Sequence, residues 1–458
     1  MQRIHPVRLW SVILACLLFS SALAQGESPA QQPACAPADE AGLRALAGEF
    51  YADYAKKDLD GLFQLWSPKT PELEAHRQAM QKFFAGHEKI EVKGPTIRKM
   101  GVEAEKAKLR VEVEVSAIEV KTGKPATDLG KMMRVLEGVK EDGAWKIWRE
   151  APAEEDLAET LASLKTDAER SALLAAENEF VTEKLVREVI RQGVSLRWQG
   201  NYPEALARFR LAKGIAEQIG DKAGMAYALN GIAEVYRLQG DYALALDNSQ
   251  KSLSMSEAMG DKAAVVRALN NVAGVHLFQG NYEQALEHLQ KGLATSEALA
   301  DKATVGRTLN NIGLVHYFQG NYEQALEHFQ KSLALSEDLG DKTAASYALG
   351  NIGIVQSDQG NYARALEHFQ KGLAISEALG DKGAVATALL NIGIVHRQQG
   401  NYVQALEHFQ KSLAISEALG DKVAAARALN KIGVVYSWQG NNQQAPEYFH
   451  KSLAMSEA

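Results

Sequence analysis

The residues best suited to recognising another molecule are asparagines that recur at a fixed interval. Four of them lie forty residues apart, at one equivalent position of successive segments: Asn271, Asn311, Asn351 and Asn391. A side-chain amide both donates and accepts hydrogen bonds, so such a row can pair with the main chain of an extended peptide whatever its sequence. Because asparagine is intrinsically unfavourable within a helix, the row predicts contact with a ligand. The alternatives are hydrogen bonds between neighbouring helices and passive copying during duplication. The row stops at both ends, where the equivalent residues are Arg191, Gly231 and Lys431.

Positions that vary between these otherwise similar segments carry arginine and aromatic side chains. One row reads Tyr227, Arg267, Arg307, Tyr347, Thr387 and Arg427, and a second reads Arg237, Leu277, Tyr317, Ser357, Arg397 and Ser437, with Phe278, Phe318 and Trp438 beside it. Such side chains are common interface anchors, because they offer a large contact area and forked hydrogen bonding. We expect these to contact a partner with some acidic character: Arg267, Arg307, Tyr347, Tyr317, Phe318 and Arg397. Drift without function is the alternative.

Histidines also recur, in two sets that could suggest a metal site. One set is His288, His328, His368 and His408, and the other is His276, His316 and His396. A metal ion requires ligands that converge within one coordination sphere, whereas equivalent residues of successive segments are separated by the thickness of a helix pair. The sequence therefore predicts no metal, no cofactor and no catalytic residue among the repeats.

The segments themselves are repeats of forty residues. Glycine marks the same point in each of them: Gly200, Gly240, Gly280, Gly320, Gly360, Gly400 and Gly440. Residues 301–340 contain two stretches of helical periodicity, with Gly320 where the first helix must reverse. Asn321 is expected to cap the second helix, with Gln324 as its reciprocal partner, and Asp341 to cap the next repeat. A fixed period of this length predicts a solenoid of stacked helix pairs.

The repeat resembles the tetratricopeptide repeat family. The residues that carry the resemblance are Leu309, Ile312, Gly313, His316, Ala325 and Phe329. The repeat is longer than the commonest form and is similar to kinesin light chain-type repeats, with Gly-Asp-Lys in place of the usual boundary proline. The resemblance implies a right-handed α-solenoid of seven helix pairs over residues 181–458. It also implies that the first helix of each pair lines the concave face, where the asparagine row would contact a protein or peptide partner.

The last repeat departs from the others. Asn442 replaces a tyrosine and Pro446 replaces a leucine. Proline just beyond the first turn should delay the start of the final helix. This end of the solenoid is therefore expected to be a weak cap, through which copies of the chain could associate.

The N-terminal part has a different organisation. Residues 43–66 and 70–84 have helical patterns, residues 108–115 alternate as a strand, and residues 131–139 and 144–149 form a predicted hairpin. The stretches FYADYAKKDLDGLFQLWSP and DGAWKIWRE resemble nuclear-transport-factor-like, or ketosteroid-isomerase-like, domains. The resemblance implies a cone-shaped pocket lined by Tyr54, Trp66, His76, Trp145 and Trp148. Among Asp53, Asp58, Asp60 and His76 no catalytic pair stands out, which favours binding or dimerisation over catalysis.

The first residues have the features of a secretory signal. Arg3 and Arg8 precede an apolar run, LWSVILACLLF, and Ala22-Leu23-Ala24 forms a small-x-small cleavage site. Cleavage is predicted after Ala24, with lipoprotein processing at Cys16 as the disfavoured alternative. It would leave Cys35 as the only cysteine, so no intramolecular disulfide is expected. No later segment is apolar enough to span a membrane, and no basic stretch indicates nucleic-acid binding.

These observations predict a mostly α protein in which a small α+β domain precedes the solenoid. The expected divisions are a signal peptide (1–24), a disordered linker (25–37), the α+β domain (38–155), a stiff helical connector (156–180) and the solenoid (181–458). The predicted function is that of an exported scaffold, periplasmic or extracellular, that binds a protein or peptide and is not an enzyme. The alternative is a small-molecule sensor or enzyme acting through the N-terminal pocket.

Overall fold

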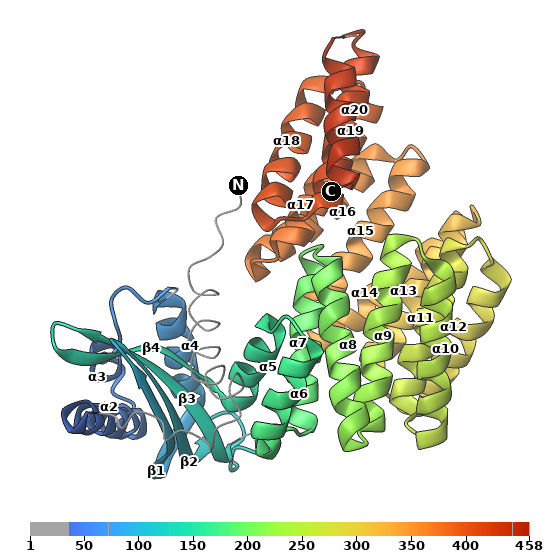
Figure 1. The fold of residues 1–458 in the computed structure, drawn as a ribbon. Coiled ribbons are helices and arrows are strands. Elements are labelled where there is room, and N and C mark those ends of the chain that lie inside the picture. The colour runs from blue at the N-terminus through green and yellow to red at the C-terminus, as the bar shows by residue number, and fades with distance from the viewer. Residues whose placement is uncertain (1–35, 72, 128, 442, 458) are drawn as a thin grey trace. The chain divides into compact units, whose positions relative to one another are not determined.

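A computed structural model describes residues 36–71, 73–127, 129–441 and 443–457 of the chain, and Figure 1 shows its helices and strands. The chain divides into two compact parts, residues 1–188 and 189–458, here called the N-terminal region and the repeat region. The predicted signal peptide and nearly all of the predicted linker lie outside the described residues, as do Cys16, Cys35 and Asn442. In the described ranges, no helix is both long and apolar enough to cross a membrane.

The N-terminal region consists of helices followed by a sheet. Its helices are α2 (Pro37–Lys56), α3 (Leu59–Gln64) and α4 (Leu73–Gly86). The strands β1 (His87–Glu103), β2 (Lys106–Glu119), β3 (Gly130–Glu141) and β4 (Ala144–Pro152) form an antiparallel sheet in chain order. Asp142 and Gly143 have φ values of 51° and 82°, as a two-residue hairpin turn requires. The α+β organisation and the hairpin are confirmed, while the nuclear-transport-factor-like fold stays a prediction.

Strand β1 was not expected from the sequence. It lies at the edge of the sheet and pairs with β2, and its register shifts between Lys93 and Thr96, around Gly94 and Pro95. Proline is tolerated at such an edge or bulge because it need not donate to a ladder. Most of the strand is exposed or half-buried, so its residues need not alternate between polar and apolar. The periodic signal on which a strand prediction depends is therefore weak here.

The predicted connector is not one stiff helix. Residues 156–180 contain most of α5 (Ala153–Ser163), all of α6 (Asp167–Ala176) and a 3₁₀ turn (Asn178–Phe180). Thr166 and Glu169 form a capping box that starts α6, which explains the break between the two helices. Helix α5 belongs to the N-terminal region, because buried Asp156 accepts a hydrogen bond from Lys108 Nζ on β2 at 2.6 Å. Compact packing thus continues past the predicted domain end at residue 155.

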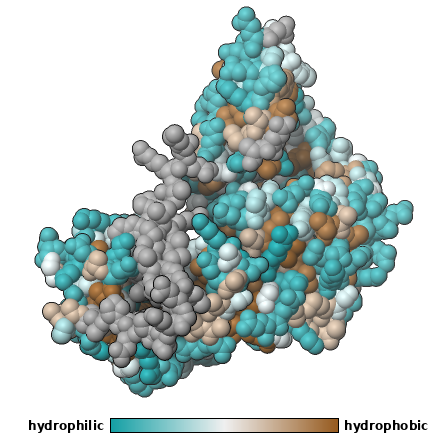
Figure 2. Space-filling model, viewed as in Figure 1, coloured by the Kyte–Doolittle hydropathy of each residue, from teal (hydrophilic) through white to brown (hydrophobic). Residues whose placement is uncertain are grey.

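Seven helix pairs make up the repeat region together with residues 183–188, the start of its first helix, which confirms the predicted solenoid of repeats (Figure 1). The first helices are α7 (Glu183–Trp198), α9 (Lys222–Gln239), α11 (Lys262–Phe278), α13 (Lys302–Phe318), α15 (Lys342–Asp358), α17 (Lys382–Gln398) and α19 (Lys422–Trp438). The second helices are α8 (Tyr202–Ile219), α10 (Tyr242–Met259), α12 (Tyr282–Ala298), α14 (Tyr322–Leu339), α16 (Tyr362–Leu379), α18 (Tyr402–Leu419) and α20 (Gln444–Glu457). The face of this region shown in Figure 2 is predominantly hydrophilic, with hydrophobic residues scattered over it.

The junctions between helices follow most of the sequence rules. Gly320 and Gly340 have φ values of 79° and 67°, and the Asp341 side chain accepts a hydrogen bond from the Ala344 amide at 3.0 Å. The predicted cap at Asn321 is wrong, because its Nδ2 instead donates to Gln319 Oε1 at 3.3 Å and its side chain makes no cap hydrogen bond. In the last repeat α20 begins at Gln444, two residues later than in the repeats that begin with tyrosine, as the proline in its first turn predicts.

Small and large residues interlock between the two helices of a repeat. A Cβ added at Gly313 would lie 2.7 Å from the ring of Phe329, and Gly353, Gly393 and Gly433 approach the equivalent phenylalanines as closely. The third repeat has Ala273 and Leu289 at these two positions, so a larger first residue accompanies a smaller second one. The glycine is therefore a packing requirement of the phenylalanine that faces it.

The first helices line the inner side of the solenoid. Successive first helices from α9 to α19 contact one another, whereas contacts between successive second helices are weaker or absent in the described residues. Elements that approach each other most closely lie on the inside of a curved stack. The curvature brings the first and seventh repeats together, since a Cβ at Gly200 would lie 3.2 Å from Oδ1 of Asp421. We call the surface formed by the first helices the inner groove.

Candidate functional site

Three of the four predicted asparagines use their amide nitrogens within the solenoid. Nδ2 of Asn271, Asn311 and Asn351 donates to Oδ1 of an asparagine on the preceding first helix, at 3.1, 3.1 and 2.9 Å. The acceptors are Asn230, Asn270 and Asn310, which were not predicted as site residues. For Asn270 and Asn310 the signal was visible as the asparagine doublets at 270–271 and 310–311, whereas Asn230 is followed by glycine. These three asparagines therefore form hydrogen bonds between neighbouring helices, which was the alternative to contact with a ligand.

Asn391 differs from the other three. The residue that would accept its hydrogen bond is replaced by Gly350, and a Cβ built at that glycine would meet open space beyond the backbone of its own helix. Asn391 is half-buried, and its amide makes no side-chain hydrogen bond to the described residues. Both its donor and its acceptor are therefore available to a ligand.

The predicted arginine and aromatic side chains lie on the first helices, and several are already paired. Arg267 stacks on Tyr227 with 4.5 Å between its Cζ and the ring centroid, and it donates to the Tyr227 hydroxyl. Arg307 Nη2 donates to Thr304 Oγ1 at 2.9 Å. These contacts hold both guanidinium groups in one orientation, which reduces the side-chain entropy lost when a ligand binds.

The aromatic members lie at the ends and starts of first helices. Tyr317 donates its hydroxyl to Asp358 Oδ2 at 2.7 Å, and burial followed by this hydrogen bond raises the pKa of Tyr317. Phe318, beside it, is 49% exposed and its ring centroid lies 6.4 Å from that of Phe278. Tyr347, on α15, is 45% exposed. Exposed rings of this size on an inner surface provide apolar contact area for a ligand.

Arg397 belongs to a cluster of cations that the sequence did not reveal as a group. Burial lowers the pKa of Lys431, and the neighbouring guanidinium groups of Arg397 and Arg427 lower it further. None of these three forms a salt bridge with a carboxylate of the described residues. Arg397 also lies over Trp438, with 5.6 Å between Cζ and the ring centroid. We call Arg397, Arg427 and Lys431 the cationic cluster; its sequence signal is that Lys431 replaces the asparagine of the four preceding repeats, one helical turn after Arg427.

The histidines pair in stacks between the two helices of a repeat. The ring centroids of His276 and His288 are 5.7 Å apart, and those of His396 and His408 are 5.4 Å apart. Burial lowers the pKa of all four. Within the described residues, no group of three or more His, Cys, Asp or Glu side chains is arranged to hold a metal ion.

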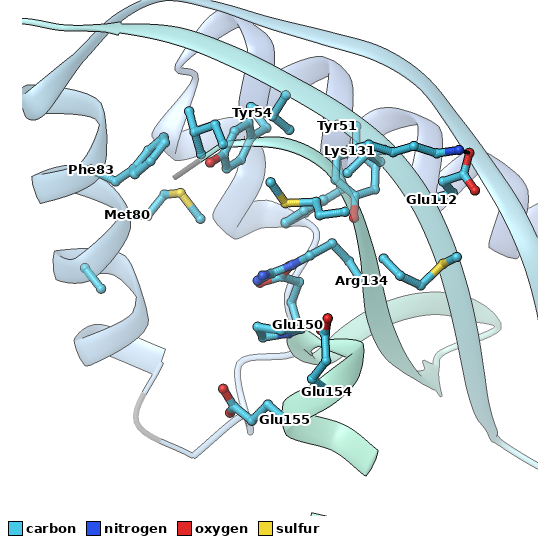
Figure 3. A pocket seen from close by; sticks show the side chains of 18 of the residues that line it. Tyr51, Tyr54, Met80, Phe83, Glu112, Lys131, Arg134, Glu150, Glu154 and Glu155 are labelled. Atoms are coloured by element: carbon cyan, nitrogen blue, oxygen red, sulfur yellow. Dashed lines mark hydrogen bonds and ion pairs between the residues drawn. The ribbon is translucent and has the colours of Figure 1, made fainter. Parts of the chain in front are cut away.

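The N-terminal region contains a cavity of about 760 Å³ that is lined by residues of α2, α3, α4, the sheet, α5 and the segment 179–188 (Figure 3). Tyr54, Trp66 and His76 line it, as the sequence analysis expected. Trp145 and Trp148 do not line it. Trp145 instead donates its Nε1–H to Asp39 Oδ1 at 3.0 Å and packs in the core. A residue that the sequence analysis did not assign to the pocket, Tyr51, is among the lining side chains.

The family model of the tetratricopeptide repeat matches residues 188–258, 224–298, 265–338, 304–378 and 384–458. The chain belongs to the tetratricopeptide repeat family. A search of curated protein sequences finds no match. The fold is similar to that of a Rap protein complexed with Competence and Sporulation Factor, with a TM-score of 0.50 and 15% identity over 92% of this chain and 98% of that one.

Two further structures are among those similar to this chain. One is the Rap conjugation gene regulator of the plasmid pLS20 in complex with the Phr* peptide, with a TM-score of 0.50 and 14% identity over 68% of this chain and 86% of that one. The other is a kinesin light chain-like protein of Podospora anserina with nearly identical repeats, with a TM-score of 0.35 and 14% identity over 42% of this chain and 94% of that one. At these identities the two Rap structures, each with a TM-score of 0.50, show a similar fold alone.

Proposed function

We propose that this tetratricopeptide protein is a non-enzymatic scaffold that holds an acidic peptide, or an acidic extended segment of a protein, in its inner groove. The observation that carries the proposal is the cationic cluster, three positive side chains close together without a described carboxylate partner. Gathering like charges at a half-buried place is unfavourable unless an opposite charge joins them. A ligand carboxylate would provide it.

The surroundings of the cluster favour an extended chain as the ligand. Asn391 lies at the position in α17 that corresponds to Lys431 in α19, and its free amide can pair with main-chain groups on either side of the carboxylate. Trp438, which is 64% exposed, offers a flat apolar surface beside Arg397. Opposite charge, hydrogen bonds to the main chain and apolar contact are the interactions by which proteins bind extended peptides.

The comparisons support the choice of a peptide. One of the two Rap structures was determined with the Phr* peptide and the other with Competence and Sporulation Factor. A helical repeat fold of this kind can therefore hold such a ligand. Which peptide this protein binds would depend on the residues of its inner groove, since its sequence identity to the Rap proteins is low.

A binding selection with a matched control tests the proposal. Peptides selected from a random library on the immobilised chain should be enriched in aspartate and glutamate. A variant with Arg397→Ala, Arg427→Ala and Lys431→Ala should lose at least tenfold in affinity for them, because each removes a charge from the site. The control removes three exposed lysines of second helices, with Lys291→Ala, Lys331→Ala and Lys371→Ala, each of which forms an i,i+4 pair with a glutamate.

The control variant should bind as the parent chain does, because exposed pairs of this kind contribute little to stability and lie away from the inner groove. Equal losses in the two variants would show that binding follows net charge alone. Unchanged affinity in the groove variant would exclude the cationic cluster as the site.

We also propose that the chain is exported, on the basis of its first 24 residues. The mature protein recovered from an envelope or culture fraction should begin at Gln25, as read by mass spectrometry of its N-terminal peptide. Cys16→Ser should leave this cleavage unchanged, because the cysteine lies inside the predicted apolar run. An intact Met1 in the native host would exclude export by this route, and loss of processing in the Cys16→Ser chain would favour lipoprotein processing.

A further inference from the structure

The first helices of consecutive repeats carry exposed apolar side chains near their C-terminal ends. Leu238, Phe278 and Phe318 occupy one equivalent position in α9, α11 and α13, and they are 44%, 50% and 49% exposed. The ring centroids of Phe278 and Phe318 lie 6.4 Å apart, and the two ring planes are tilted by 60°. The rings therefore form one surface across two repeats, and contiguous exposed apolar surface marks an interaction site. We call Leu238, Phe278 and Phe318 the apolar rim.

The fold of the repeat does not require an apolar residue at this position. The equivalent residues of repeats 5 and 6 are Asp358 and Gln398, yet these repeats have the same helix pair as the others. Tryptophan holds the position in repeats 1 and 7. Aromatic residues in two successive repeats occur in this row at Phe278 and Phe318 alone. The paired rings are thus a local feature that packing within the solenoid does not explain.

An arginine lies against the apolar rim. The Cζ atom of Arg237 is 5.1 Å from the ring centroid of Phe278, and its guanidinium group forms no salt bridge with a carboxylate of the described residues. The nearby carboxylate, Glu234, is paired with Arg197 instead. Because Arg237 is half-buried, its charge is only partly solvated. A ligand carboxylate beside the Phe278 ring would therefore be favourable.

Two glutamine amides beside the rim are held in one orientation. Gln279 and Gln319 directly follow the two phenylalanines. Their Oε1 atoms each accept a hydrogen bond at 3.3 Å, from Nδ2 of Asn281 and Asn321. Both glutamines are exposed, and their Nε2 groups make no hydrogen bond to the described residues. Two oriented N–H donors are thus available to carbonyl oxygens of a ligand.

We propose that the apolar rim binds a proline-rich segment of a partner protein that carries an acidic residue next to its prolines. The pyrrolidine rings pack on the exposed phenylalanines, main-chain carbonyls accept hydrogen bonds from the glutamine amides, and the carboxylate pairs with Arg237. A polyproline II helix suits an open surface, because it is extended before it binds and loses little conformational entropy. Its rise places alternate residues about 6.2 Å apart, close to the separation of the two rings. The rim lies in repeats 2–4 and does not depend on the cationic cluster of repeats 6 and 7.

Three peptides with a neutral fluorescent label test the proposal on the full chain. The first has one glutamate followed by six prolines, the second has lysine in place of the glutamate, and the third has alanines in place of the prolines. Dissociation constants measured by fluorescence anisotropy should rank the glutamate–proline peptide tightest. The lysine peptide should bind about two- to fivefold more weakly, the scale of one exposed ion pair. The alanine peptide should bind at least about tenfold more weakly, since it lacks the rings that pack on the rim.

Substitutions copied from other repeats of the chain should leave the fold intact. Phe278→Gln combined with Phe318→Gln introduces the residue of repeat 6 and should weaken the glutamate–proline peptide at least about tenfold. Arg237→Ser introduces the residue of repeats 5 and 7 and should abolish the preference for glutamate over lysine. The control is Val403→Gln, at a 79% exposed residue of α18, which should bind as the parent chain does.

The variant with Arg397→Ala, Arg427→Ala and Lys431→Ala distinguishes the rim from the cationic cluster. It should keep its affinity for the glutamate–proline peptide, because the rim is unchanged in it. Loss of that affinity would place the peptide at the cationic cluster and overturn the rim site. Equal affinity for the proline and alanine peptides, or unchanged binding by the chain without the two phenylalanines, would also overturn it.

Discussion

Asn351 and Asn391 occupy equivalent positions, yet their side chains have different surroundings. Asn351 donates to Asn310 at 2.9 Å, while Gly350 removes the corresponding acceptor from Asn391. One residue type, repeated in register, therefore serves two purposes. Where the preceding repeat has an asparagine at the acceptor position, the amide joins neighbouring repeats; where that position is Gly350, the amide is left for a ligand. The place of the interruption, beside the cationic cluster, supports the location proposed for binding.

Alanine substitution should separate these two purposes. Asn351→Ala leaves the Asn310 oxygen without its donor and should lower the free energy of unfolding by about 1 kcal/mol, measured by urea denaturation. Asn391→Ala should change that free energy by less than about 0.5 kcal/mol but weaken binding of the selected acidic peptides. If both variants are equally destabilised, or if Asn391→Ala binds as the parent does, the distinction between the two asparagines is wrong.

At the scale of the element, the helix pair is held together by complementary sizes. Gly313 and Phe329 interlock where α13 crosses α14, and the third repeat shows the compensating pair Ala273 and Leu289. Comparison of the repeats within one chain thus shows which residues change together. Interlocking of this kind also fixes how deeply each second helix packs against its first helix.

The compensating pair predicts a rescue. Gly313→Ala alone should destabilise the chain by about 1–3 kcal/mol, because the added methyl group would overlap the Phe329 ring. Adding Phe329→Leu should recover much of this loss, since it recreates the third-repeat pair. Gly350→Ala is the matched control: it lies in a first helix with open space at the Cβ and should be neutral or stabilising by about 0.5–1 kcal/mol. Thermal unfolding of the parent and the three variants gives their stabilities. Additive losses in the double variant would contradict the inference that a larger residue at position 313 requires a smaller one at position 329.

The sequence predicted the helix pairs well because seven copies repeat the same apolar spacing, turn glycines and aspartate caps. It predicted the site less well. The pairing of Asn311 with Asn270, and the approach of Arg397 to Lys431, depend on how neighbouring repeats are rotated, which no single repeat encodes. The N-terminal strand β1 was missed for a different reason: an exposed edge strand needs no alternation of apolar residues.

At the scale of the whole molecule, the partly buried histidines of the repeats make the stability of the solenoid sensitive to acid. Burial lowers the pKa of six repeat histidines: His276, His288, His328, His368, His396 and His408. The unfolded chain, with a histidine pKa of about 6.5, binds protons before the folded chain does. The contribution of these histidines to stability is therefore fully present above about pH 6.5. It is lost as the pH falls through their lowered pKa values in the folded chain.

The melting temperature should consequently fall between pH 7 and pH 5. These side chains are partly exposed, so solvent screening keeps the effect small, on the order of 2–4 °C. The control copies the seventh repeat, where Tyr436 and Tyr448 stack at 5.4 Å in place of histidines. A chain with tyrosine at His276, His288, His396 and His408 should lose part of the pH dependence. If the pH dependence of the melting temperature is unchanged in that chain, other titratable groups cause it.

The contact of Gly200 with Asp421 joins two residues that are far apart in the sequence. Contact between the first and seventh repeats restricts how a long polymer can enter the inner groove. A free chain end can be threaded along the axis, whereas a segment between two folded domains has to wait until the contact opens. We therefore expect a peptide with bulky groups at both ends to associate slowly and, once captured, to be released slowly. The kinetics of such a complex would then report on the opening of the solenoid itself and not on the strength of any one side-chain contact.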